Sequence, residues 1–529
     1  MNFHSIYLKT FFTTALILVY FCSFGQISMK GKITLSNGEP AFGATIYINE
    51  LQIGTTADSL GYYELGNLKK GYYSLRVSFV SAQPWVEKQF FLENTIEKNF
   101  ELKKDDTALN EVVITGTMKE VSKLDSPVPV DIITAKFLYK NPVASIFEGL
   151  TYVNGIRPQL NCNVCNTGDI HINGLEGPYT MVLIDGMPMV SGLSTVYGLS
   201  GIPNSLIDRV EIVKGPASTL YGSEAVGGLI NIITKNPSKA PQFSVDAFST
   251  SWLDYNLDVG AKFNLGKKVD ALVGINYFNY QNPKDKNNDG FTDLTLQKRI
   301  SIFSKWSVKR MDKKQTTLAA RYYYEDRWGG QMQWNKDFRG GDSLYGESIY
   351  TRRFEILGNY DLPGSENFKL QYSFSNHHQN SYYGTVPFFA DQKIGFAQFL
   401  WDKNIGKHSL LVGTPIRYTY YNDNTTATMN LDKSDKPDRI LLPGIFIQDE
   451  VNLKNHTVLL GARYDYNSRH GNIFTPRFAY KYKFNQTDVV RLNFGRGFRI
   501  VNLFTEDHAA LTGAREVIIR EKLKPEQSW

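Results

Sequence analysis

The stretch VDALVGINYFNY, residues 269–280, indicates the fold class of this chain, because its side chains alternate between two kinds. One face of a strand would carry Val269, Ala271, Val273, Ile275 and Tyr277, and the other Asp270, Gly274 and Asn276. Alternation with a period of two is typical of a β-strand. A strand of about ten residues with one apolar face and one polar face is the repeating unit of a transmembrane β-barrel.

The same alternation returns in TLAARYYYE (317–325) and TVLLGARYDY (457–466). The side chains expected to point outward are Leu318, Ala320, Tyr322, Tyr324, Val458, Leu460, Ala462 and Tyr464, and those expected to point inward are Arg321, Glu325, Gly461, Arg463 and Asp465. About thirteen such strands fit between positions 242 and 498, and short turns alternate with long loops as in an outer-membrane barrel. A soluble β-sandwich is the alternative, but one-sided polarity over so many strands favours the barrel.

Bulk composition narrows the function. Charged residues make up 21% of the 529 residues, and the net charge of +6 is spread along the chain, so no basic block indicates a nucleic-acid partner. Residues 1–25 contain Lys9, the apolar run FFTTALILVYFCSF and the small residues Ser23 and Gly25. This pattern predicts a secretory signal peptide, and the bulky residues before Cys22 argue against a lipid anchor there.

Residues 26–104 read as short alternating strands separated by turn pairs such as Asn37-Gly38, which predicts a small β-sandwich. The stretches NGEPAFGATI (37–46), DSLGYYEL (58–65) and GYYSLRVSF (71–79) carry a resemblance. They are similar to the carboxypeptidase-regulatory-like domain, a transthyretin-like sandwich. Nothing in this region has a catalytic pattern.

Residues 118–236 have mixed α/β character, with a helix predicted to start at Asn141-Pro142. The ordered motifs HINGLEGPYTMVLIDG (171–186), RVEIVKGP (209–216), LYG (220–222) and AVGGLINIITK (225–235) follow. Together they resemble the plug domain of TonB-dependent outer-membrane receptors. The predicted fold is therefore mainly β: a sandwich, a small α/β plug and an antiparallel transmembrane barrel.

Barrels of this family have twenty-two strands, so residues 237–529 resemble only the first part of one. At about 20 residues per strand and loop, roughly 180 to 220 residues would complete it. An open barrel leaves two unpaired edges in lipid, which is costly. We therefore expect the chain to be a fragment or a truncated product.

The segment EVVIT, Glu111 to Thr115, lies in the predicted linker 105–117 and resembles the TonB box of the family. The resemblance implies that Glu111, Val112, Val113, Ile114 and Thr115 add as a strand to the sheet of TonB. We expect the segment to be tethered and free to pair. The alternative is an ordinary last strand of the sandwich.

The resemblance implies energised uptake of a scarce nutrient across the outer membrane of a Gram-negative bacterium, with the sandwich in the periplasm. The implied partners are TonB with its proton-driven inner-membrane complex, a small-molecule ligand and the lipid bilayer. A ferric siderophore is the first choice of ligand, and haem or cobalamin the second. A surface-binding or signalling receptor without transport is the rival class. No HExxH or GxSxG motif indicates an enzyme, and no cofactor is required.

The stretch NCNVCN contains Cys162 and Cys165, the only cysteines outside the signal peptide. In an oxidising compartment a local disulfide is the default, with a metal or haem contact and redox exchange as alternatives. The preceding NGIRPQ faces the external ligand in the family. Arg157, Gln159 and, from a later loop, His508 are therefore ligand-facing candidates.

Two further candidates concern metals and haem. The loop DKNNDGFTD supplies oxygens at Asp285, Asn287, Asp289 and Asp293 and resembles the start of a calcium loop, although Leu296 stands where a glutamate belongs; a solvated loop is the alternative. His508 resembles the histidine that haem receptors carry between two motifs, but the first motif departs from the family pattern. The pair His377-His378 is a weaker haem candidate.

Overall fold

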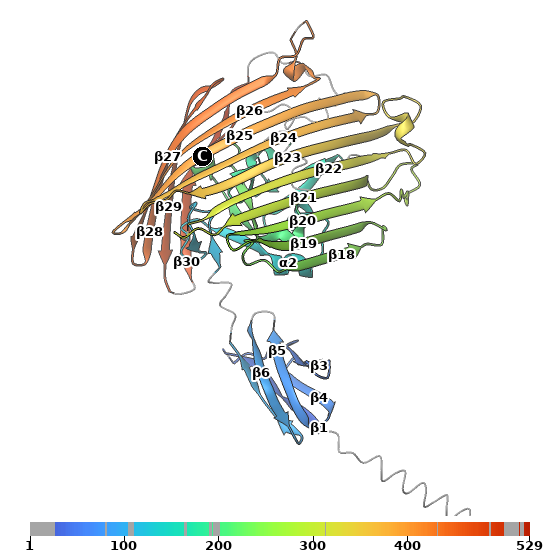
Figure 1. The fold of residues 1–529 in the computed structure, drawn as a ribbon, viewed down its shortest axis with the longest axis vertical. Coiled ribbons are helices and arrows are strands. Elements are labelled where there is room, and N and C mark those ends of the chain that lie inside the picture. The colour runs from blue at the N-terminus through green and yellow to red at the C-terminus, as the bar shows by residue number, and fades with distance from the viewer. Residues whose placement is uncertain are drawn as a thin grey trace, which may run out of the picture. The chain divides into compact units, whose positions relative to one another are not determined.

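The computed structural model describes residues 27–36, 38–79, 82–103, 111–162, 167–189, 193, 201–312, 314–430, 432–485, 488–501, 518 and 523–529. It forms two compact units, Met1–Glu111 and Val112–Trp529. Both are built mainly from β-strands, which confirms the predicted fold class (Figure 1). Among the described residues, no helix is long and apolar enough to cross a membrane.

The first unit is a β-sandwich of two sheets. One has the order β4-β1-β7 with β8 also paired to β1, and the other has the order β3-β2-β5-β6. The strands are β1 (Ile27–Leu35), β2 (Thr45–Ile48), β3 (Ile53–Thr56), β4 (Tyr62–Leu68), β5 (Gly71–Phe79), β6 (Ala82–Leu92), β7 (Ile96–Glu97) and β8 (Phe100–Leu102). Apolar side chains at alternate positions, such as Met29, Ile33, Leu75 and Val77, are fully buried in one core.

The plug forms the start of the second unit, around a five-stranded sheet of order β11-β16-β17-β14-β15. Its strands are β9 (Val112–Val113), β10 (Val121–Ser122), β11 (Val130–Thr134), β12 (Ile156–Cys162), β13 (Thr167–Ile172), β14 (Thr180–Ile184), β15 (Met187–Pro188), β16 (Ile207–Lys214) and β17 (Gly228–Thr234). The strands β14 and β17 run parallel, and every residue of β14 is buried, as expected for a strand covered on both faces.

Short helices surround this sheet: α2 (Ala135–Lys140), α3 (Ile146–Gly149), η2 (Leu150–Tyr152), η3 (Gly177–Tyr179), η4 (Asn204–Leu206) and α5 (Ser218–Tyr221). The prediction that a helix starts at Asn141-Pro142 is wrong, because Asn141 is the C-terminal cap of α2. The next helix starts later, where the Ser145 hydroxyl accepts a hydrogen bond from the Glu148 amide.

A sheet of thirteen antiparallel strands in sequence order follows, as predicted. They are β18 (Phe243–Ser249), β19 (Tyr255–Leu265), β20 (Val269–Tyr280), β21 (Leu296–Val308), β22 (Thr316–Gly330), β23 (Gly346–Asp361), β24 (Asn367–Tyr383), β25 (Val386–Ile405), β26 (His408–Asp423), β27 (Asp438–Leu453), β28 (His456–Asn467), β29 (Gly471–Lys483) and β30 (Val489–Gly495). The remaining elements are η5 (Lys336–Phe338), η6 (Thr426–Thr428) and the paired β31 (Gly497–Arg499) and β32 (Glu526–Ser528).

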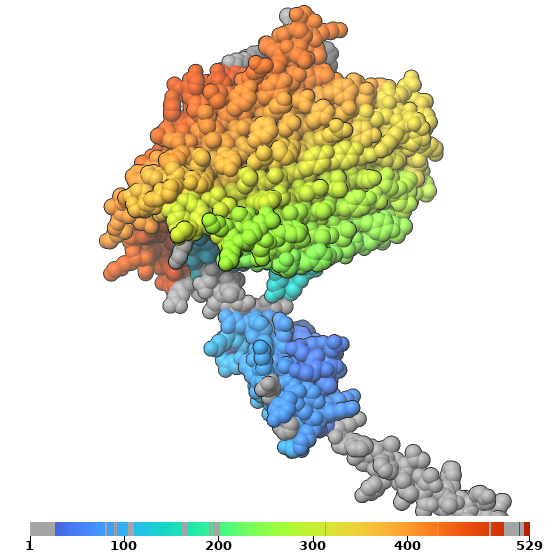
Figure 2. Space-filling model, viewed as in Figure 1, coloured from blue at the N-terminus to red at the C-terminus, as the bar shows by residue number. Residues whose placement is uncertain are grey.

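The sheet curves around the plug (Figure 1), so it has an inner face toward the plug and an outer face away from it. The predicted alternation is confirmed. On β22 the outward Leu318 and Tyr322 are each 44% exposed, whereas the inward Arg321 is 1% exposed. The outer face of β19–β26 forms a continuous wall in Figure 2, and only small cyan and teal parts of the plug are visible below its lower edge.

Apolar side chains also join the plug to the inner wall. Phe303, Ala319 and Leu357 from the barrel strands belong to the same buried cluster as the plug residues Ile184 and Ile230. Burying this surface favours a seated plug by about 25 cal/mol per Å² of apolar area.

Candidate functional site

The 111–115 segment is docked on the plug. Its strand β9 pairs antiparallel with β10, with Val113 opposite Val121. Val113 is fully buried, in one apolar cluster with Val128 and Val130, while Val112 is 46% exposed. We expected a free tether, and the structure differs because the plug offers an apolar site for Val113 and hydrogen-bond acceptors for the amides that follow.

Glu211 on β16 holds the end of the segment. Its Oε2 accepts hydrogen bonds from the Ile114 amide at 2.9 Å, the Thr115 amide at 2.8 Å and the Thr115 hydroxyl at 2.5 Å. Glu211 is fully buried and Thr115 is 1% exposed. Three donors on one carboxylate oxygen form a set of charge-assisted hydrogen bonds, which are about twice as strong as neutral ones.

We call the contacts of Glu211 with Ile114 and Thr115 the latch, and three more plug residues complete it. Arg209 Nε donates to the other carboxylate oxygen of Glu211 at 2.8 Å. Asn231 Nδ2 donates to the Thr115 hydroxyl at 2.9 Å, and the Tyr221 hydroxyl donates to the Thr115 carbonyl at 3.0 Å. Burial raises the pKa of Tyr221 above its usual range, so this phenol stays protonated and remains a donor. Thr115 is therefore tied to three strands or helices of the plug core.

The chain just after the segment is held by cations of the barrel strands. Arg491 on β30 donates to the carbonyls of Ser126, Lys123 and Leu124 at 2.9 to 3.0 Å. In the opposite direction, Lys119 of the plug pairs with Asp402 of β25 at 2.5 Å. These contacts attach the entry of the plug to two strands, β25 and β30, at the rim that carries the short turns.

A second attachment lies in the LIDG motif. Lys305 Nζ of β21 lies 2.9 Å from Asp185 Oδ2 and donates to the Thr234 hydroxyl at 2.7 Å. The side chains of Lys305 and Asp185 are each 10% exposed. Buried pairs of this kind are costly to break by removing one partner, so this pair fixes the plug sheet to the wall.

Arg463 makes a third attachment. It pairs with Asp465 on the same strand at 2.7 Å and donates to the Leu220 carbonyl of α5 at 3.0 Å. Elsewhere on the inner wall, Arg321 and Arg353 share the carboxylate of Glu355 at 2.5 and 2.6 Å. The inner wall therefore presents fixed charges that are largely matched within the protein.

The predicted ligand-facing residues are only partly described. Arg157 and Gln159 lie on β12 in the hairpin β12–β13, opposite His171 and Asp169, and the Arg157 side chain is exposed. Cys165, the Cys162 side chain and His508 lie outside the described residues, so the disulfide and ligand roles stay predictions. His377 and His378 point to opposite faces: His377 is buried beside Arg353 on the inner face, while His378 bonds Asp391 on the outer face. They do not form one haem site.

The predicted calcium loop uses its oxygens for its own backbone. Asp285 accepts from the amides of Asp289 and Gly290, Asp289 accepts from Phe291, and Asp293 accepts from Lys286. Among the described residues, no group of three or more His, Cys, Asp or Glu side chains is arranged to hold a metal ion. Calcium binding at Asp285, Asn287, Asp289 and Asp293 stays a prediction.

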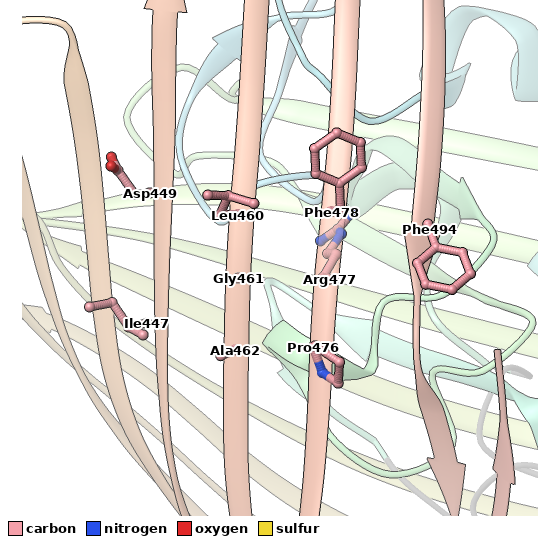
Figure 3. A pocket seen from close by; sticks show the side chains of 9 residues that line it. All are labelled: Ile447, Asp449, Leu460, Gly461, Ala462, Pro476, Arg477, Phe478 and Phe494. Atoms are coloured by element: carbon pink, nitrogen blue, oxygen red, sulfur yellow. The ribbon is translucent and has the colours of Figure 1, made fainter.

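A hollow of about 450 Å³ opens across β27–β30 (Figure 3). Outward apolar side chains, among them Leu460, Phe478 and Phe494, border it, and the small residues Gly461 and Ala462 form part of its lining. Leu460 and Phe494 are each 54% exposed. The hollow therefore belongs to the lipid-facing type of surface rather than to the polar interior.

Sequence reasoning missed the latch and the attachments. Glu211 lies 96 residues from Thr115 along the chain, so no local pattern links them. One signal was present: Glu211 is the only charged residue in the apolar run VEIV (210–213) of β16, and a buried carboxylate requires partners.

Three family matches cover most of the chain. Residues 29–114 match the CarboxypepD_reg-like domain, residues 122–229 the TonB-dependent Receptor Plug Domain, and residues 262–529 the TonB dependent receptor-like beta-barrel. The three matches follow one another in the order that the sequence motifs predicted.

Solved receptors share the fold at low identity. The siderophore receptor PirA from Pseudomonas aeruginosa is 17% identical, with a TM-score of 0.52 over 71% of this chain and 65% of that one. A mutant form of the ferric enterobactin receptor PfeA from the same organism is 16% identical, with a TM-score of 0.56 over 71% of this chain and 63% of that one. P. aeruginosa FpvA bound to heterologous pyoverdines is 16% identical, with a TM-score of 0.56 over 75% of this chain and 60% of that one. The chain thus spans 60% to 65% of the length of these receptors.

The barrel match alone covers half of the chain, and the plug match covers the domain that the sheet encloses. The α/β plug and the sequential antiparallel sheet agree with those matches. The chain belongs to the TonB-dependent receptor family.

Proposed function

We propose that this chain is part of an outer-membrane receptor that takes up a ferric siderophore with energy delivered through TonB. The observation that carries the proposal is the latch between Thr115 and Glu211. The last residue of the 111–115 segment is hydrogen-bonded to Glu211 of β16, and β16 pairs with both β11 and β17 of the plug sheet. A pull on this segment therefore acts first on Glu211 and the centre of the plug, and not on a peripheral loop.

The segment itself suits strand addition. Val112 is half-exposed, so β9 presents one side to a partner while Val113 stays buried. Backbone pairing with an added sheet edge needs an extended segment and little side-chain specificity. TonB would compete with β10 for the backbone of residues 112 and 113, and would then load the latch at Thr115.

The ligand class rests on the solved relatives, whose names specify siderophores, ferric enterobactin and pyoverdines. Uptake of haem or cobalamin, and a surface receptor that binds or signals without transport, are the alternatives. The proposed orientation places the short-turn rim and the sandwich in the periplasm and the long loops outside. The proposal includes no catalytic step.

Val112→Pro tests the coupling role, with Val112→Thr as the matched control. Proline removes a backbone donor and obstructs pairing, whereas threonine keeps a β-branched side chain. In cells lacking the native copy, we expect V112P to abolish accumulation of radiolabelled iron from ferric siderophores while leaving ligand binding intact, and V112T to retain both. Haem and cobalamin in the same assay identify the alternative ligands. Full uptake by V112P would reject the coupling role.

A further inference from the structure

The outer face carries cations that pair with tyrosines instead of carboxylates, close to the rim with the long loops. Lys393, Tyr420 and Arg439 lie directly opposite one another on β25, β26 and β27. Lys393 Nζ lies 5.5 Å from the centre of the Tyr420 ring, and Arg439 Cζ lies 6.0 Å from it. One tyrosine thus lies between two exposed cations.

A second tyrosine–cation group continues the row. Arg339, from the loop between β22 and β23, lies 4.7 Å from the ring of Tyr350 and 4.5 Å from the ring of Tyr382. Its guanidinium donates to the Ser348 hydroxyl at 2.7 Å and to Asn380 at 2.7 to 3.0 Å. These contacts lie on the outward register of β23 and β24, so the loop rests on the outer face.

We call Arg339, Tyr350, Arg352, Tyr382, Lys393, Tyr420 and Arg439 the tyrosine–cation belt. Among the described residues, none of its four cations forms an ion pair, and Arg352, Lys393 and Arg439 are exposed. On the same face, Asp391 bonds His378 and Asp326 bonds Lys336. Even when the carboxylate of Asp391 is counted, because its histidine partner is charged only when protonated, the four cations leave the belt with a net positive charge.

The belt lies at one edge of an uncharged band. On β25 the outward positions between Lys393 and Lys403 are Gly395, Ala397, Phe399 and Trp401, and on β27 those between Arg439 and Asp449 are Leu441, Pro443, Ile445 and Ile447. Ten residues rise about 33 Å along a strand, or about 23 Å along the membrane normal at a tilt of about 45°. A transmembrane barrel has an apolar band about 25 Å tall, so the belt falls at headgroup depth.

The two edges of this band differ in whether their charged side chains have a partner. At the short-turn edge, Lys403 pairs with Glu366 at 2.5 Å and Asp449 bonds His408 at 2.6 Å. Within the described part of β25 and β27, the outward cations without an ion pair lie at the long-loop edge. Guanidinium and ammonium groups recognise phosphate oxygens, and tyrosine suits the interface between lipid and water.

We propose that the tyrosine–cation belt binds the phosphate groups of anionic lipids in the leaflet that surrounds the long-loop rim. Charge complementarity and headgroup depth select a lipid and not a soluble anion. The inference rests on the membrane location in the proposed function, but it requires neither TonB nor a transported ligand.

The test uses the full chain in zwitterionic detergent and bisphosphorylated lipid A as the probe, with binding measured by native mass spectrometry. We expect K393Q to weaken binding about fivefold and K393Q/R439Q about 25-fold, at about fivefold for each interfacial cation. The matched control K403Q, on the same strand and face, should leave binding unchanged. The charge-preserving K393R/R439K should bind like the wild type, which separates loss of charge from misfolding.

Each of the following outcomes would contradict the proposed lipid site. Equal binding of dephosphorylated lipid A would exclude phosphate recognition, and competition by millimolar inorganic phosphate would indicate a soluble-anion site. Equal losses in K393Q and K403Q would indicate general electrostatics. Concentration-dependent dimerisation that K393Q/R439Q abolishes would assign the face to a second copy. Failure of uptake in V112P with intact lipid binding, or the reverse, separates the two proposals.

Discussion

Replacing Glu211 by glutamine should release the 111–115 segment without removing its apolar anchor. The carboxylate oxygen accepts three hydrogen bonds from Ile114 and Thr115. Hydrogen bonds to a charged group contribute about 1.5–3 kcal/mol each, against about 0.5–1.5 kcal/mol for neutral ones. Losing about 1 kcal/mol from each of three bonds weakens the docked state by about 3 kcal/mol, and Arg209 loses its acceptor as well.

Hydrogen exchange at the amides of Ile114 and Thr115 measures this release. At 1.4 kcal/mol for each tenfold change, E211Q should lower their protection about 100-fold. Asp208→Asn is the control, because Asp208 also pairs with Arg209, at 2.7 Å, but is half-exposed and does not touch the segment. D208N should leave protection unchanged. Unchanged protection in E211Q, with the plug still folded, would refute the latch.

Three other changes test the plug and its seat. Lys305→Met leaves Asp185 buried without its cation and should destabilise the seated plug by about 3–5 kcal/mol, partly recovered in K305M/D185N, as judged by thermal unfolding. Gly228→Ala should cost about 1–3 kcal/mol in the same assay, because φ is +150° and a Cβ would lie 2.3 Å from the Val213 carbonyl oxygen. Glu224 is a buried plug residue, and burial raises the pKa of its carboxyl group above 4.5. The wild type therefore loses stability as pH rises above 4.5 and this carboxyl group must ionise in the folded protein. E224Q has no such group, so its unfolding temperature should rise relative to that of the wild type over the same pH range.

The barrel could be predicted from the sequence because its rule is local. A period of two assigns each side chain to a face, and Arg321 and Leu318 fall as that rule requires. The same rule, applied to His377-His378, already separates adjacent histidines onto opposite faces. The docked state of the segment could not be predicted in this way, because the sequence of EVVIT specifies an extended backbone but not its acceptor.

Loop chemistry sets another limit on sequence reasoning. Closely spaced Asp and Asn side chains can bind a cation or accept hydrogen bonds from their own loop, and both uses need the same spacing. In DKNNDGFTD the structure shows the second use, with Gly290 in the left-handed region and its amide bonded to Asp285. A composition signal alone therefore cannot distinguish a metal loop from a self-capped turn.

The latch and the plug's seat differ in how they would respond to force. The segment is held by a few charge-assisted hydrogen bonds and one buried valine. The plug is held to the wall by the buried Lys305–Asp185 pair, the Lys119–Asp402 pair and a shared apolar cluster. A force on the segment would act first on the hydrogen bonds of Thr115, and only then on the strand β16 that contains their acceptor, Glu211. Because the weaker element would lie nearer the pulled end, we expect a modest force to release the segment before it disturbs the contacts between plug and wall.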